Sequence, residues 1–279
     1  MPTILLGLIG DNIAASRAPE LHHAAGRLCG VDVRYELLVP KALGRDFDAV
    51  FDHARAEGYR GLNITYPYKE RVVRRVTVAD RHIRAIGACN TVLFDSAGPV
   101  GDNTDYTGFV HAFRATFGKV SPGIVAVAGC GGAGKAIGFA LAQLGARALR
   151  LFDTDPMKSR ALHDALTDAH PQLDVAIADS IEEASAFADG LVNATPAGMI
   201  GLGGNAFPAS TLRGARWVFD AVYTPLDTAF LTSARAAGLA AMSGFELYFH
   251  QGVDAFRLFA QIDVDPAALR SALASPPST

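Results

Sequence analysis

The sequence of 279 residues contains few cysteines and no cluster of them. Its three cysteines, Cys29, Cys89 and Cys130, are odd in number and widely spaced, which argues against a disulfide framework and indicates free thiols in a reducing compartment. No spacing of cysteine and histidine resembles a zinc site. We therefore expect neither structural disulfides nor a bound metal.

Long apolar runs and runs of one charge are missing as well. The formal net charge is −3 and the chain has no Lys/Arg run, which argues against nucleic acid or an anionic membrane as the main partner. The first apolar segment, residues 4–9, is too short to span a bilayer and follows no basic leader. We expect a cytoplasmic protein that binds a small molecule through locally placed donors.

Half of the residues are apolar, and the chain is long enough for two cores. In the first third, strands are predicted at 4–9, 33–39, 61–65 and 91–94, and a helix at 44–57. A predicted helix at 106–117 then leads into strands at 124–128, 149–152, 175–177, 191–192 and 217–222, which alternate with helices up to a helical tail. This alternation predicts an α/β fold of two domains, one of them a Rossmann-like, doubly wound parallel sheet.

A glycine-rich motif of the form G-x-G-x-x-G follows the predicted strand 124–128 and opens a helix. It consists of Gly129, Cys130, Gly131, Gly132, Ala133 and Gly134. Gly129 permits the tight turn, Gly131 lets the backbone approach a pyrophosphate, and Gly134 allows close packing of the helix on the sheet. The helix N-terminus adds unpaired N–H groups and a positive dipole end, so the motif predicts a dinucleotide site.

The carboxylate of Asp153 ends the next predicted strand, at the spacing expected for an acid that binds the adenosine ribose. A carboxylate there accepts hydrogen bonds from ribose hydroxyls and repels a 2′-phosphate, which favours NAD over NADP. Two alternatives stay open. Asp153 could cap the following helix, and the nearby cations Lys158 and Arg160 could serve a 2′-phosphate.

Three polar clusters lie in the first third, at predicted strand ends and loops where polar function tends to occur. They are residues 63–69, which include Lys69, then Asn90 with Thr91, and residues 102–105, which include Asp105. A lysine and an aspartate in such loops could exchange a proton with an alcohol. Asn, Asp and Thr are equally typical of turns and caps, so both interpretations stand on spacing alone.

The chain resembles shikimate dehydrogenases over nearly its full length. The most diagnostic stretches are GLNITYPYK at 61–69 and DNTDYTGF at 102–109, and further matches lie at 7–22, 87–91, 127–134, 193–199, 218–225 and 244–256. The resemblance implies a substrate domain formed by residues 1–105 and 244–279, with the nucleotide domain inserted as residues 106–243.

The resemblance also implies roles for individual residues. Lys69 and Asp105 would be the catalytic pair, with Lys69 exchanging a proton with the reacting hydroxyl. Substrate hydroxyls would be bound by Asn63, Asn90 and Gln251, and the substrate carboxylate by Ser16, Thr65 and Tyr223. Beside the glycine motif and Asp153, the cofactor would be lined by Asn193, Thr195, Gly198, Met199 and Gly244.

The sequence departs from the family pattern at two places. Ala18 stands where family members commonly carry a second hydroxyl, so one donor to the substrate carboxylate is missing. Glu246 follows Gly244 where the usual glycine and methionine are absent. Asp153, in place of the usual Asn-Arg-Thr neighbourhood, points to the NAD-linked quinate/shikimate dehydrogenase branch.

We therefore expect an oxidoreductase that interconverts a shikimate- or quinate-type cyclic hydroxy acid and its 3-dehydro ketone by hydride transfer. Its place would be in the chorismate pathway of aromatic amino acid biosynthesis, as a monomer or homodimer. Two alternatives follow from the altered substrate loop around Ala18. They are a dehydrogenase for a differently substituted acid such as an amino-shikimate, and a non-catalytic dinucleotide-binding regulatory protein.

Overall fold

The computed structural model describes residues 3–274 and divides into two compact units. The first unit comprises the residues up to Thr104 together with those from Gln251 onward, and the second runs from Asp105 to His250. None of the helices within residues 3–274 has the length and apolarity that a bilayer crossing requires.

The first unit is built on a five-stranded sheet of order β2-β1-β3-β4-β5. Its strands are β1 (Thr3–Ile9), β2 (Asp32–Leu38), β3 (Gly61–Ile64), β4 (Thr91–Asp95) and β5 (Gly98–Asp102). Strands β1, β2 and β3 run parallel, whereas β4 and β5 form an antiparallel hairpin on β3. The hairpin partner β5 was not predicted from the sequence, which indicated only a turn after residue 94.

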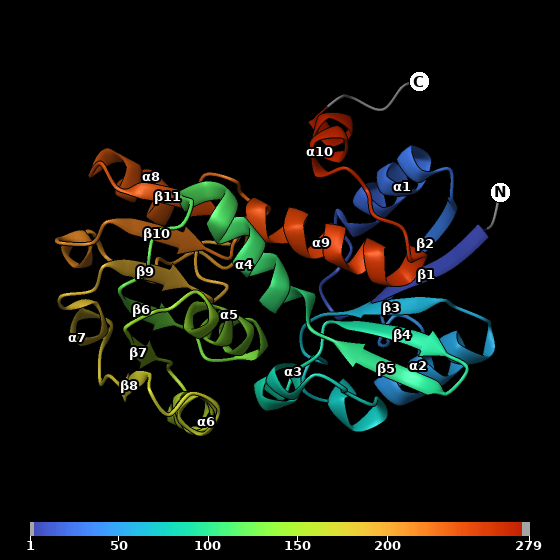
Figure 1. The fold of residues 1–279 in the computed structure, drawn as a ribbon, viewed down its shortest axis with the longest axis horizontal. Helices are drawn as coiled ribbons and strands as arrows, with labels where there is room; N and C mark the ends of the chain where they lie inside the picture. The colour runs from blue at the N-terminus through green and yellow to red at the C-terminus, as the bar shows by residue number, and fades with distance from the viewer. Residues whose placement is uncertain (1–2, 275–279) are drawn as a thin grey trace. The chain divides into compact units, whose positions relative to one another are not determined.

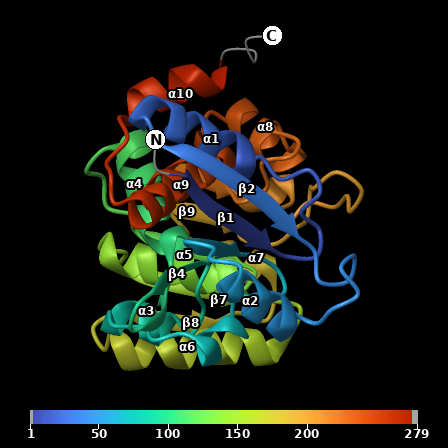
Figure 2. The ribbon, with the colours of Figure 1, turned by 90° about the vertical axis from the view of Figure 1, so that its right-hand side faces the viewer.

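Helices cover this sheet and complete the first unit. They are α1 (Ala18–Cys29), α2 (Phe47–Ala56), the short 3-10 helix η1 (Val72–Arg75), α3 (Arg81–Ile86), α10 (Pro266–Ala274) and the second half of α9 (Gly244–Ala260). Helix α2 begins at Phe47, later than predicted, because the Asp46 carboxylate caps it by accepting a hydrogen bond from the Ala49 N–H at 2.8 Å. Figures 1 and 2 show α10 beside α1.

Alternating side chains of the first sheet face two different helical layers, as a pleated sheet requires. Leu62 packs in a core with Phe47 and Phe51 of α2. A Cβ built on Gly61 would meet the Phe259 ring at 2.4 Å, so Gly61 faces α9 on the opposite side. Asn63 shares the Gly61 side, which places a polar group under α1 and α9 rather than against α2.

The second unit is a six-stranded sheet in which every pairing is parallel, as the sequence predicts. Its order is β11-β10-β9-β6-β7-β8, which Figure 1 shows from top to bottom. The strands are β6 (Ile124–Ala128), β7 (Ala148–Phe152), β8 (Asp174–Ile177), β9 (Gly190–Asn193), β10 (Trp217–Asp220) and β11 (Ala240–Ser243). The Rossmann-like fold class is thereby confirmed.

Helices lie on both faces of this second sheet. They are α4 (Thr104–Phe117), α5 (Gly132–Gln143), α6 (Pro156–Ala169), α7 (Ile181–Ser185), the 3-10 helix η2 (Ala209–Leu212), α8 (Ala229–Ala236) and the first half of α9. On one face Val218 packs with Phe230 of α8. On the other, the Phe219 ring meets the Phe109 ring of α4 edge-on, with centroids 5.0 Å apart. Consecutive residues of β10 therefore serve two cores, which is why the strands are apolar throughout.

Candidate active site

A buried polar network in the first unit connects three of the predicted substrate-binding amides, Asn63, Asn90 and Gln251. Asn63 lies in β3, where its backbone is in register with Thr91 of β4. Asn90 immediately precedes β4, and Gln251 is carried by α9. Asn90 and Gln251 are 161 residues apart in the sequence, yet Asn90 Nδ2 lies 3.4 Å from Gln251 Oε1.

Asn90 is the centre of this network. Its Oδ1 accepts hydrogen bonds from the Thr104 N–H at 2.7 Å and from the Thr91 hydroxyl at 3.0 Å. Its Nδ2 donates to Thr104 Oγ1 at 3.0 Å as well as to Gln251. Because a backbone N–H can only donate, the Asn90 side-chain atom that faces the Thr104 N–H must be the oxygen. The NH₂ group of Asn90 therefore faces Gln251. Thr104, which received no role from the sequence, is thus part of the network.

The segments that carry Lys69 and Asp105 join the same network through their backbones. The Cys89 N–H donates to the Lys69 carbonyl at 2.9 Å, which ties the Lys69 loop to the residue before Asn90. Asp105 directly follows Thr104 and is only 7% exposed. The expectation that Asp105 lies in a loop was wrong, because α4 begins at Thr104 and Asp105 belongs to its first turn.

Ser16 and Thr65 belong to the segments that follow two neighbouring parallel strands, β1 and β3. The Thr65 N–H donates to the Ile9 carbonyl at 2.9 Å, and Ser16 Oγ accepts from the Ala18 N–H at 3.3 Å. Arg17 forms two hydrogen bonds to the Glu20 carboxylate, at 2.9 and 3.2 Å. Tyr223 belongs to the second unit, where it stacks on Tyr248 with ring centroids 5.4 Å apart.

The buried thiols are unsuited to nucleophilic chemistry. Burial raises the pKa of Cys89 to about 12, and Asp102 adds to the shift. Burial likewise raises the pKa of Cys130 to about 12, with a contribution from Asp153. Both groups are therefore protonated at neutral pH. Within residues 3–274, no group of three or more His, Cys, Asp and Glu side chains is arranged to hold a metal ion.

The glycine motif has the geometry that a pyrophosphate-binding turn requires. Gly129 adopts a φ of 93°, in the region that favours glycine. A Cβ on Gly134 would lie 1.9 Å from the Gly129 carbonyl oxygen, so this contact demands glycine. A Cβ on Gly131 would meet nothing within 4 Å, which leaves its backbone open to a ligand beside the first turn of α5, where Gly132 and Ala133 lie.

The Asp153 carboxylate lies against this same loop, just after β7. Its Oδ2 accepts a hydrogen bond from the Cys130 N–H at 2.7 Å, and its Oδ1 accepts from the Asp155 N–H at 2.9 Å. The alternative that Asp153 caps α6 is wrong, because the cap is Asp155, which accepts from the Met157 N–H. Asp153 is thus held against the glycine turn by backbone N–H groups of the turn and of the segment before α6.

The conformation of the predicted cofactor-lining loop 194–199 is held by hydrogen bonds to Asn193, which is completely buried. Its Oδ1 accepts from both the N–H and the hydroxyl of Thr195, at 3.0 and 2.6 Å, and its Nδ2 donates to the Ala197 carbonyl at 3.1 Å. These bonds make Asn193 a residue that shapes the loop. Gly198 has a φ of 94° and Met199 is 40% exposed.

Asp220, at the end of β10, is a buried carboxylate that was not predicted from the sequence as a functional residue. It accepts hydrogen bonds from Asn193 Nδ2 at 2.9 Å, from the Val222 N–H at 3.0 Å and from the Thr228 hydroxyl at 2.6 Å. Burial raises the pKa of Asp220, against the effect of these three donors. Gly244 lies close by, since a Cβ there would be 2.4 Å from the Ala221 carbonyl oxygen.

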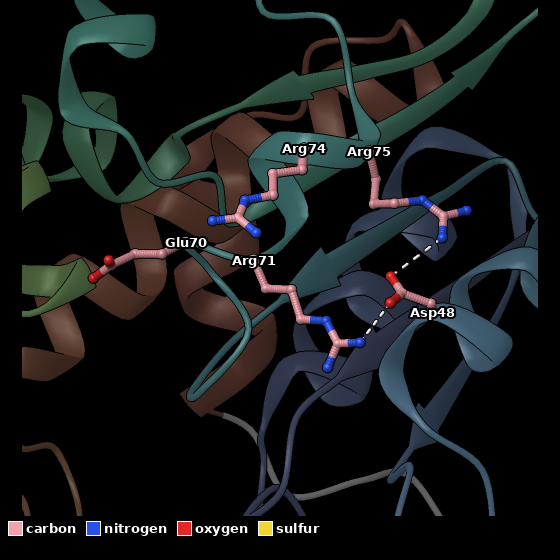
Figure 3. A pocket seen from close by; sticks show the side chains of 5 residues that line it. All are labelled: Asp48, Glu70, Arg71, Arg74 and Arg75. Atoms are coloured by element: carbon pink, nitrogen blue, oxygen red, sulfur yellow. Dashed lines mark hydrogen bonds and ion pairs between the residues drawn. The ribbon is translucent and has the colours of Figure 1, made fainter.

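A cavity of about 540 Å³ in the first unit is lined by charged side chains, and none of the predicted site residues is among them. It is lined by Asp48, Glu70, Arg71, Arg74 and Arg75 (Figure 3). Arg71 and Arg75 both pair with Asp48, and their guanidinium groups lie over the rings of Phe47 and Phe51. These contacts fasten η1 to α2, so the arginines are explained as packing.

A family model, curated relatives and solved structures match this chain. A family model described as the shikimate dehydrogenase substrate binding domain matches residues 8–92. A quinate/shikimate dehydrogenase (NAD(+)) of Corynebacterium efficiens is 39% identical, with 98% of each chain covered. A shikimate dehydrogenase (NADP(+)) of Pseudarthrobacter chlorophenolicus is 34% identical over 96% of this chain and 93% of that protein. The solved quinate dehydrogenase of Corynebacterium glutamicum in complex with NAD matches with a TM-score of 0.89 at 36% identity, covering 98% of this chain and 99% of that one.

Proposed function

The chain belongs to the shikimate dehydrogenase family, and from this premise we propose that it interconverts a shikimate- or quinate-type acid and its 3-dehydro ketone with NAD. The observation that carries the proposal is the buried network of Asn63, Asn90 and Gln251, tied to the segments that bear Lys69 and Asp105. Amides held in this way offer fixed donors and acceptors to the hydroxyls of a cyclic polyol.

In the proposed reaction Lys69 takes the proton of the hydroxyl that becomes the ketone, and returns it in the reverse direction. Asp105 accepts a hydrogen bond from the lysine and so orients its amine toward that hydroxyl, which lets the proton move along a fixed line. The nicotinamide cofactor supplies hydride acceptance and donation when it is bound. The contribution of the protein is positioning together with proton transfer.

The substrate carboxylate is assigned to Ser16, Thr65 and Tyr223. Ala18 contributes no hydroxyl there, and Arg17 is engaged with Glu20. The space that Ala18 leaves near the carboxylate end supports a second candidate substrate, an acid with a different substitution such as an amino-shikimate. Oxidation of the amino-shikimate, without oxidation of shikimate or quinate, would favour that candidate.

We propose NAD as the preferred cofactor because of Asp153. Its carboxylate is next to the turn that would hold the pyrophosphate. There it would accept hydrogen bonds from the ribose hydroxyls and repel a 2′-phosphate. Relatives named for NAD and for NADP both occur, so kinetics with the two cofactors decide the preference. A higher kcat/KM with NADP would contradict this part of the proposal.

The test of the reaction is the absorbance of NADH formed from shikimate and from quinate at alkaline pH. We expect turnover with at least one acid, and a fall in kcat of about 10²- to 10⁴-fold in Lys69→Ala while NAD binding is unchanged. Lys41→Ala, which removes an exposed lysine of the same unit, is the matched control. Near wild-type turnover by Lys69→Ala would refute the role of Lys69. NAD binding without oxidation of either acid would instead favour the regulatory alternative.

A further inference from the structure

A phenol and an imidazole lie behind Asn63 in the interior of the first unit. We infer that Tyr35 and His22 are positioning residues, which hold the Asn63 carboxamide with its NH₂ group turned toward Asn90 and Thr91, where the substrate hydroxyls are proposed to bind. This inference rests on the proposed function and goes beyond it, because neither residue belongs to the substrate-binding set described above.

The orientation of the Asn63 carboxamide is set by its neighbours on both sides. The Tyr35 hydroxyl donates to Asn63 Oδ1 at 2.8 Å. On the other side, Asn63 Nδ2 lies 3.3 Å from Thr91 Oγ1 and 3.5 Å from the Asn90 carbonyl oxygen. A flipped amide would place Oδ1 against that carbonyl, and two acceptors repel each other. Tyr35 thus stabilises the orientation in which the amide donates toward the network.

The two long contacts of Asn63 Nδ2 also indicate that this group could form a stronger hydrogen bond with a ligand. Distances of 3.3 and 3.5 Å are at the limit for N–H···O hydrogen bonds, whereas the Tyr35 bond is short. A substrate hydroxyl at normal distance would therefore find the NH₂ group oriented and weakly engaged. Pre-orientation of this kind lowers the ordering cost of binding.

His22 holds Tyr35 in place from the α1 side. The two rings stack with centroids 4.9 Å apart and an interplanar angle of 17°. The Phe256 and Phe259 rings of α9 lie 6.2 and 5.8 Å from the imidazole, which completes an aromatic enclosure. Burial lowers the pKa of His22 to about 3, although a hydrogen bond with Asn63 acts to raise it. The ring is therefore neutral at physiological pH. A neutral imidazole packs against the phenol and the amide without placing a positive charge beside the proposed substrate site.

A second phenol in the same unit provides the matched control. Tyr59 is 7% exposed and Tyr35 is 8% exposed, and each hydroxyl donates to a side-chain oxygen. The partner of Tyr59 is Glu36, which takes no part in the Asn63 network. Tyr59→Phe therefore reports what the loss of a buried phenol hydrogen bond does to the fold alone.

The decisive experiment is a double-mutant cycle on the full-length enzyme with shikimate and quinate. We expect Tyr35→Phe to raise the KM of the acid about tenfold, with the KM of NAD unchanged, while Tyr59→Phe leaves both constants as in the wild type. In the Asn63→Ala background, Tyr35→Phe should have no further effect on the KM, because Tyr35 acts through Asn63. Additive effects, or equal effects of the two phenylalanine variants, would overturn the inference.

If Tyr35→Phe does not fold, His22→Phe serves in its place, since it retains a ring to stack on Tyr35 but removes the bond to Asn63. We expect the same non-additive rise in the KM of the acid, and an unchanged KM would overturn the inference. Wild-type protein that neither binds nor oxidises either acid would overturn the proposed function and this inference together. Wild-type activity with unaffected variants would overturn the inference alone.

Discussion

The Asn193 amide donates a hydrogen bond to Asp220 Oδ1 at 2.9 Å in the interior of the second unit. The pair joins the ends of the neighbouring strands β9 and β10. Asn193 also accepts a hydrogen bond from the Thr195 hydroxyl just after β9, and Asp220 accepts one from the hydroxyl of Thr228, the N-cap residue of α8 (Ala229–Ala236). The shape of the predicted cofactor loop therefore depends, through Asn193, on the buried carboxylate of Asp220.

Removal of the Asp220 carboxylate should destabilise the second unit. In Asp220→Ala the donors from Asn193, Val222 and Thr228 lose their common acceptor, and we expect a loss of about 3 kcal/mol or more in the free energy of unfolding. Asp220→Asn retains an acceptor for two of them and should lose about 1 kcal/mol. Urea unfolding measures both values. Equal stability of the two variants would contradict this account.

The glycine motif should separate folding from cofactor binding. Gly134→Ala places a Cβ against the Gly129 carbonyl oxygen, so we expect a lower melting temperature. Gly131→Ala meets no protein atom and should leave the melting temperature unchanged, but it narrows the approach of the pyrophosphate and should raise the KM of NAD about tenfold. A Gly131→Ala enzyme with normal affinity for NAD would show that the turn does not hold the cofactor.

Asp153→Asn should shift the choice of cofactor toward NADP. The change removes the negative charge that repels a 2′-phosphate, so we expect the ratio of kcat/KM for NAD over NADP to fall at least tenfold, or about 1.4 kcal/mol. Asp155→Asn removes the same charge two residues away and keeps a good capping side chain, which makes it the control. An unaltered ratio in Asp153→Asn would place the ribose elsewhere.

His22 should make the first unit sensitive to acid. Its pKa is about 3 when folded and 6.5 in an unfolded chain, so between these values the unfolded state binds more protons. Stability attributable to His22 is therefore complete above pH 6.5 and is lost as the pH falls toward 3. In His22→Phe, the slope of unfolding free energy against pH between pH 6 and 4 should decrease by up to about 1.4 kcal/mol per pH unit. An identical slope would indicate that His22 becomes solvated.

Ala18→Ser should restore a donor near the proposed carboxylate site. Hydrogen bonds to charged groups contribute about 1.5–3 kcal/mol, so we expect the KM of the acid to fall about tenfold or more. Ala15→Ser adds an exposed hydroxyl on the other side of Ser16 and serves as the control. If Ala18→Ser weakens binding instead, the native substrate requires the space that the alanine leaves.

Much of the fold followed from local patterns. Strands β6 to β10 were predicted because each contains a short apolar run between turn residues, and β6 has the predicted bounds, Ile124–Ala128. Strand β11 (Ala240–Ser243) was not predicted from the sequence. By contrast, β5 was not predicted, because a hairpin strand containing glycine and proline acquires its conformation from pairing with β4. Asp220 was missed because a lone aspartate at a strand end has the same local pattern as a turn residue.

The sequence by itself determined the fold class and the glycine motif, because these depend on periodicity and on glycines at fixed spacing. Only the tertiary structure decided which polar groups meet. The bonds of Asn90 to Gln251, of Asn63 to Tyr35 and of Asn193 to Asp220 join residues from different elements. A buried amide is oriented by the donors and acceptors around it, and these are brought together only when the strands and helices pack.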